Sequence, residues 1–100
     1  MGIFSFNNEF DVTVKHPTDD VYEKFVENIR KKRWAIISAE QAKNVSFQTK
    51  VSLFSWPIDF TVNFIAVEEN LTKLSVSTSS ANLDLGRSKG IINDIIKEIY

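Results

Sequence analysis

The sequence contains no cysteine, and this absence excludes several kinds of chemistry. The chain can form no disulfide, offers no thiolate nucleophile and builds no zinc site with cysteine ligands. It also lacks a phosphate loop, a dinucleotide-binding motif and a nucleophile elbow. The single histidine, His16, stands before Pro17 with no partner at a motif spacing, so we expect a solvent-exposed turn residue there.

Basic residues are not in excess, because 12 lysines and arginines are present beside 13 aspartates and glutamates. Nucleic-acid affinity rests largely on neutralised phosphates, so the sequence predicts no nucleic-acid partner. No apolar run approaches the about 18 residues of a membrane-spanning helix, which predicts no transmembrane segment. The segment from Met1 to Phe6 lacks the charged start and long apolar core of a secretion signal. We therefore expect a cytoplasmic location.

Alternation of apolar and polar residues is clearest between Pro57 and Ser79. The apolar positions of its first half are Ile58, Phe60, Val62, Phe64 and Ala66. A polar break at residues 68–70 follows, and the alternation resumes from Leu71. This pattern predicts two antiparallel strands joined by a hairpin, each with one apolar face.

The rest of the chain predicts three more strands and two helices. The strands are expected at about residues 9–15, 34–38 and 44–53, and the helices at about residues 18–32 and 87–100. Thr18 is the expected N-cap of the first helix. Gly90 lies near the start of the second helix, where it predicts a close approach of the helix backbone to the sheet.

Each expected strand has one apolar face, and each expected helix has one apolar stripe. Two layers bury these surfaces, so we predict an α+β fold with both helices on one face of a five-stranded antiparallel sheet. The element order is β-α-β-β-β-β-α, residues 1–100 form one domain, and the first strand pairs with the fifth. The expected strand order in the sheet is therefore 1-5-4-3-2.

Several of these residues also occur in a known group of proteins. They are Trp34, the alternation from Phe60 to Phe64, the segment Asp84-Leu85-Gly86-Arg87, and Ile92 with Ile95. Over about two-thirds of its length, the chain resembles small bacterial domains of unknown function, although Ser88 stands where that group has asparagine. The resemblance implies an arrangement like one repeat of the TATA-box-binding protein, and it implies no activity.

The basic segment Gly86, Arg87, Ser88 and Lys89 opens the last helix. Free N–H groups at a helix start can bind an anion, which makes these four residues a candidate anion contact. In the alternative interpretation, which is the commoner one for such short motifs, Asp84 caps the helix, Gly86 turns the chain and the basic side chains face water.

The apolar segment from Leu53 to Trp56 is the strongest candidate for a partner contact. Trp56 either closes the end of the core, which is the commoner role, or belongs to an exposed aromatic tip that contacts a partner protein or a membrane surface. For Phe54 the sequence favours neither of these two roles. Ile65 is the one large apolar residue expected on the outer face of the sheet.

The alternation leaves no pocket of polar groups, so the sequence predicts no catalytic residue, no metal ligand and no cofactor. We expect a non-catalytic binding or protein-interaction module with an unidentified protein partner, as a monomer or weak dimer. The alternative is a carrier of an apolar small molecule held between sheet and helices. A cavity between the two layers would favour the carrier, and a filled core would favour the interaction module.

Overall fold

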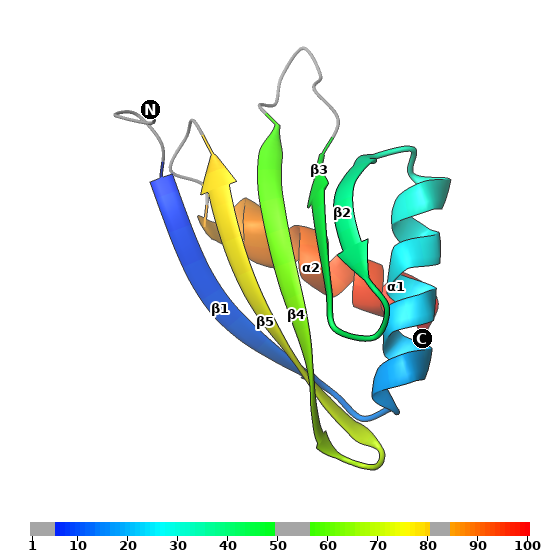
Figure 1. The fold of residues 1–100 in the computed structure, drawn as a ribbon. Helices are drawn as coiled ribbons and strands as arrows, with labels where there is room; N and C mark the ends of the chain where they lie inside the picture. Colours follow the sequence, from blue (N-terminus) through cyan, green and yellow to red (C-terminus); the bar gives the residue numbers. More distant parts are fainter. Residues whose placement is uncertain (1–5, 50–56, 81–84) are drawn as a thin grey trace.

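Within residues 6–49, 57–80 and 85–100, which the computed structural model describes, the chain forms five strands and two helices (Figure 1). The elements are β1 (Phe6–Val14), α1 (Thr18–Lys31), β2 (Ala35–Glu40), β3 (Asn44–Gln48), β4 (Ile58–Glu68), β5 (Leu71–Ser80) and α2 (Leu85–Ile99). All strand pairs are antiparallel, and the sheet order is β1-β5-β4-β3-β2. The predicted fold class, element order and strand order are therefore confirmed.

The sheet is built around the long hairpin of β4 and β5. The pairing of β5 with β1 runs without a register shift, whereas β2 is short and its register against β3 shifts between Ile36 and Ser38. The turn of the β4–β5 hairpin extends beyond the other strands (Figure 1). Ala66 is exposed there, so its predicted place on the buried face is wrong. Alternation alone does not reveal where a strand extends past the core.

Helix α1 begins after Pro17, which is in an extended conformation with φ −61° and ψ 144°. Asp19 and Asp20 occupy its first turn, where the helix dipole favours negative charge. No side chain caps the helix start, so the predicted capping role of Thr18 is wrong. The Oγ1 atom of Thr18 lies instead 3.0 Å from Oγ1 of Thr72, and this hydrogen bond ties α1 to β5.

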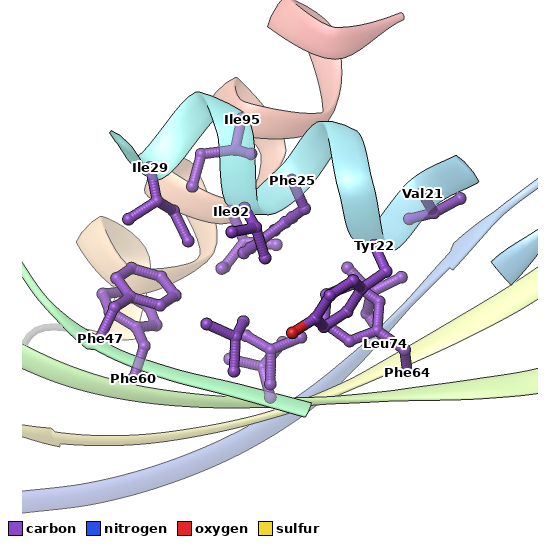
Figure 2. Packing of buried hydrophobic residues seen from close by; sticks show 14 of the residues in the cluster. Val21, Tyr22, Phe25, Ile29, Phe47, Phe60, Phe64, Leu74, Ile92 and Ile95 are labelled. Carbon is purple, nitrogen blue, oxygen red and sulfur yellow. The ribbon is translucent and has the colours of Figure 1, made fainter. Parts of the chain in front are cut away.

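The core lies between the inner face of the sheet and the apolar stripes of both helices (Figure 2). Phe60 and Phe64 of β4 are 1% and 6% exposed, so the predicted facing of this strand is confirmed. The rings of Phe47 and Phe60 stack with centroids 4.9 Å apart, and the ring of Phe25 meets Phe64 edge-on at 5.4 Å. These contacts join α1 to the middle of the sheet.

Gly90 does not mark a close approach to the sheet. A Cβ atom added at this position would meet no atom within 4 Å. The stripe that α2 buries contains Ser88, Ile92 and Ile95, and Gly90 lies on the opposite side of the helix. The predicted packing role of this glycine is therefore wrong.

We expect Phe60→Ala to lower the free energy of unfolding by about 3–5 kcal/mol, because it leaves a cavity in a filled core. Urea unfolding measures the change. Asn63→Ala, on the outer face of the same strand, is the matched control and should change stability by less than about 0.5 kcal/mol. Equal stability of the two variants would contradict the facing assigned to β4.

We expect Gly90→Ala to stabilise the protein by about 0.5–1 kcal/mol, because alanine loses less backbone entropy in a helix and has room for its methyl group. Thermal unfolding should show a higher midpoint than that of the wild type. A lower midpoint would mean that the backbone of α2 is in closer contact than the structure indicates.

Candidate functional site

Of the residues that the sequence singled out, those that the structure describes lie on different elements, Ile65 on β4 and the segment from Gly86 to Lys89 on α2. Phe54 and Trp56 lie outside the described residues, while Ile65 is 44% exposed on the outer face of β4, opposite Lys73 of β5. These partner contacts stay predictions.

The candidate anion segment lies in the first turns of α2. Ser88 is buried at 2% exposure, and Nζ of Lys89 lies 5.9 Å from the ring centroid of Phe10 on β1. Gly86 belongs to the helix and has no positive φ, so it does not turn the chain as the alternative interpretation expected. Asp84 lies outside the described residues. Arg87 and Ser88 both have interaction partners within the protein. Ser88 is thus buried whereas Gly86 and Lys89 are exposed, and the anion contact stays a prediction.

A groove of 560 Å³ lies between α1 and the end of β2, and we call it the α1–β2 groove. Tyr22 and Val26 of α1 are only 4% and 6% exposed, and they form its apolar side together with Ala39 of β2. The remaining lining residues are Glu23, Glu27, Arg30 and Gln41. The groove therefore combines an apolar interior with a charged rim.

The bulge in β2 explains why this part of the inner face is open. Ile36 pairs with Phe47, and Ala39 pairs with Val45, although two residues lie between Ile36 and Ala39. The extra residue, Ile37, is 64% exposed, and Ala39 returns to the inner side of the sheet. Alanine is too short to reach α1, so the space between this sheet margin and the helix stays unfilled.

Burial raises the pKa of Tyr22, with a smaller contribution from the negative charge of Glu40, and the positive charge of Arg30 opposes the rise. The Tyr22 hydroxyl therefore stays protonated at neutral pH and can donate a hydrogen bond. Figure 2 shows its ring beside Phe64, which it meets edge-on with centroids 5.1 Å apart. This contact fixes the direction of the side chain.

A hollow of 200 Å³ between α1 and α2 is lined by Lys24, Glu27, Asn28, Lys31, Glu98 and Ile99, and two further hollows lie elsewhere in the described part of the chain. One of 360 Å³ lies beside the β4–β5 turn and is lined by Pro17, Thr18, Asp19, Ala66, Val67, Glu68 and Glu69. The other, of 340 Å³, lies on the outer sheet face among Glu9, Asp59 and the hydroxyls of β5. Over residues 6–49, 57–80 and 85–100, no group of three or more His, Asp or Glu side chains is placed to hold a metal ion.

His16 is half-buried, so its predicted place in solvent is wrong. Its ring stacks on Tyr100 with centroids 3.7 Å apart and planes 3° from parallel. The Tyr100 hydroxyl donates a 2.7 Å hydrogen bond to Oδ2 of Asp20, which also lies 3.4 Å from Nζ of Lys24. Sequence reasoning missed this cluster because Tyr100 lies 80 residues after Asp20 in the sequence, and no motif connects the two segments.

The cluster perturbs two pKa values. The hydrogen bond from Tyr100 is the main cause of the lowered pKa of Asp20, with smaller contributions from Lys24 and His16. Burial, together with the same hydrogen bond, raises the pKa of Tyr100. These groups hold the end of α2 against α1.

Neither helix of the described chain is long and apolar enough to cross a bilayer. No protein-family model matches the sequence, and no curated protein matches it. Solved structures do match the fold. The structure of Ara h 8.0201 has a TM-score of 0.65 at 12% identity, with 95% of this chain and 97% of that one covered.

Two further solved structures also match the fold at low sequence identity. A Thalictrum norcoclaurine synthase point mutant, in complex with a transition-state analogue, has a TM-score of 0.58 at 9% identity and covers 95% of this chain and 94% of that one. A conserved protein of unknown function from Enterococcus faecalis has a TM-score of 0.52 at 10% identity and covers 99% and 70%. At these identities the likeness concerns the fold alone. The likeness to a TATA-box-binding protein repeat stays a prediction.

Because the folded-state pKa of Asp20 is lowered, its charge stabilises the protein above the ordinary carboxyl pKa of 3.8, and this contribution is lost as the pH falls through the lowered value. We expect Tyr100→Phe to raise the pKa of Asp20, because it removes the main stabilising hydrogen bond. NMR titration of the Asp20 carboxyl carbon measures this change. Tyr22→Phe, which removes a hydroxyl elsewhere on α1, should leave that titration unchanged. An identical titration curve in Tyr100→Phe would contradict the assigned hydrogen bond.

Proposed function

We propose that this chain is a small binding domain without catalytic function that carries an apolar small molecule between the sheet and α1, in the α1–β2 groove. The proposal rests on one observation. Ala39 is exposed on the inner side of the sheet, beside two α1 side chains, Tyr22 and Val26, that are otherwise buried.

The size and chemistry of the groove suit a small ligand with an apolar body. Its 560 Å³ falls within the range of about 300–1,000 Å³ that ligand pockets have. Tyr22 and Val26 would contact the apolar body, and the protonated Tyr22 hydroxyl would donate a hydrogen bond to a polar group. Arg30, Glu23 and Glu27 at the rim favour a ligand whose polar end reaches solvent.

Among the described residues the middle of the core is one packed cluster, which is why the proposal places the ligand at the margin. Phe25, Phe47 and Ile92 are each 0% exposed and belong to one packed cluster. A filled core is expected of an interaction module, and open space between the layers is expected of a carrier. The packed centre therefore favours the interaction module, whereas the open margin favours the carrier. The matching synthase structure holds a transition-state analogue, which supports small-molecule binding by this fold.

The absence of catalysis is also part of the proposal. General acid–base chemistry needs groups with tuned pKa values in a site that excludes water. The carboxylates at the groove, Glu23 and Glu27, are exposed on the outer side of α1, and Glu27 lies 3.4 Å from Lys31 in an ordinary surface ion pair. Such groups provide solubility and ligand orientation.

A second candidate function is protein interaction through exposed apolar side chains. Ile37, Ile65 and Val67 are 64%, 44% and 52% exposed. Ile65 and Val67 lie two residues apart on β4, whereas Ile37 lies on β2, and exposed apolar residues in such small numbers are common on protein surfaces. The α1–β2 groove therefore supports the carrier better.

We expect Ala39→Trp to fill the groove and to weaken binding of the fluorescent apolar probe 1-anilinonaphthalene-8-sulfonate by at least about tenfold, which corresponds to about 1.4 kcal/mol. Fluorescence titration of the folded variants measures the affinity. Ser38→Trp is the matched control. Ser38 is the neighbour of Ala39 in the chain, but its side chain lies on the opposite face of β2, in register with Ser46.

The proposal fails if Ala39→Trp and the wild type bind the probe equally well, or if the wild type does not bind it. Native mass spectrometry of protein purified from its own host then separates the two candidate functions. A bound small molecule supports the carrier, and a bound protein without one supports the interaction module.

A further inference from the structure

One cationic side chain at the α1–β2 groove has no ion-pair partner within the described chain. Arg30 lines the groove and is exposed, and none of the ion pairs of the described residues includes it. Two carboxylates beside the groove are already neutralised by lysines. Oε1 of Glu27 lies 3.4 Å from Nζ of Lys31, and Oε1 of Glu40, at the end of β2, lies 3.3 Å from Nζ of Lys43. Neither carboxylate is left to balance Arg30.

The Tyr22 hydroxyl is a second hydrogen-bond donor directed toward the Arg30 end of the groove. Tyr22, Val26 and Arg30 follow one another at intervals of four residues, so they lie in one row along α1. In Figure 2 the Tyr22 hydroxyl points along the helix toward Ile29, the residue before Arg30. Burial raises the pKa of Tyr22, and the positive charge of Arg30 opposes that rise, so the guanidinium is close enough to act on the hydroxyl.

These two donors suit a carboxylate. A guanidinium has five N–H donors and no acceptor, and it binds a carboxylate through two parallel hydrogen bonds. Arginine is also more weakly hydrated than lysine, which lowers the cost of placing Arg30 beside an apolar surface. Val26, Ala39 and the ring of Tyr22 provide that surface.

The remaining charge at the rim repels an anion. Glu23 is exposed, forms no ion pair among the residues that the structure describes, and precedes Arg30 by seven residues. This separation is about 10 Å along the helix axis. A ligand with a single negative charge therefore binds with that charge toward Arg30. The competing arrangement places a cation at Glu23, and the direction of the Tyr22 hydroxyl favours the anion.

We propose that the ligand of the α1–β2 groove is an apolar monocarboxylate, whose carboxylate is bound by the Arg30 guanidinium and the Tyr22 hydroxyl and whose apolar body lies on Val26 and Ala39. This inference rests on the proposed carrier function and adds to it the chemical class and the orientation of the ligand.

Three ligands with the same ten-carbon chain test the proposal at neutral pH: the anion decanoate, the uncharged decan-1-ol and the cation decylammonium. Their dissociation constants are measured by displacement of the uncharged fluorescent probe N-phenyl-1-naphthylamine, so that the reporter itself does not respond to charge. Arg30→Gln should weaken decanoate binding by about five- to tenfold and leave decan-1-ol binding within about twofold, because only the carboxylate loses its ion pair. Decylammonium should bind this variant more tightly than it binds the wild type.

Arg33→Gln is the matched control, because it removes an equal charge three residues later at a position that does not line the groove. It should leave all three affinities within about twofold, since exposed charges at a distance are screened by salt. Circular dichroism should show both variants folded.

Tighter binding of decylammonium than of decanoate by the wild type overturns the inference. So does an Arg30→Gln variant in which decanoate and decan-1-ol are affected equally. The carrier proposal survives either result, because the protein still binds apolar ligands. It fails, and the inference with it, when neither the probe nor any of the three ligands binds the wild type.

Discussion

Contact between the aromatic rings of α1 and those of β3 and β4 determines where everything else in this protein can lie. Phe25 meets both Phe47 and Phe64 edge-on, and Phe47 stacks on Phe60. The helix is thereby fixed over the middle of the sheet, and α2 packs beside it over the remaining inner face through Ile92 and Ile95. These rings occupy the centre of the described core, and the α1–β2 groove lies at its margin, beside Ala39.

The sequence predicted the fold well where the buried face follows a simple period. The alternation in β4, from Ile58 to Phe64, identified the inner face of the central strand. The four-residue spacing of Val21, Phe25 and Ile29 likewise identified the buried side of α1. The pairing of the first and fifth strands followed from direction alone, because successive hairpins reverse the chain.

The sequence predicted less wherever a local irregularity or a long-range contact decides the structure. A bulge shifts the period of β2 by one residue, so the position of Ala39 at the groove could not be read from alternation. The stacking of His16 on Tyr100 joins segments that no local pattern connects. Threonine is a residue type that often caps helices, but the Thr18 hydroxyl is hydrogen-bonded to Thr72, which is far away in the sequence and adjacent in the fold.

The position of β1 has a consequence for how this protein folds during its synthesis. Its only neighbour in the described sheet is β5, and Thr72 of β5 lies 56 residues after His16. Until the ribosome has released that much more chain, the first strand cannot be paired, and its apolar side chains stay accessible. Such non-local pairing slows folding and prolongs the interval in which a nascent chain depends on chaperones.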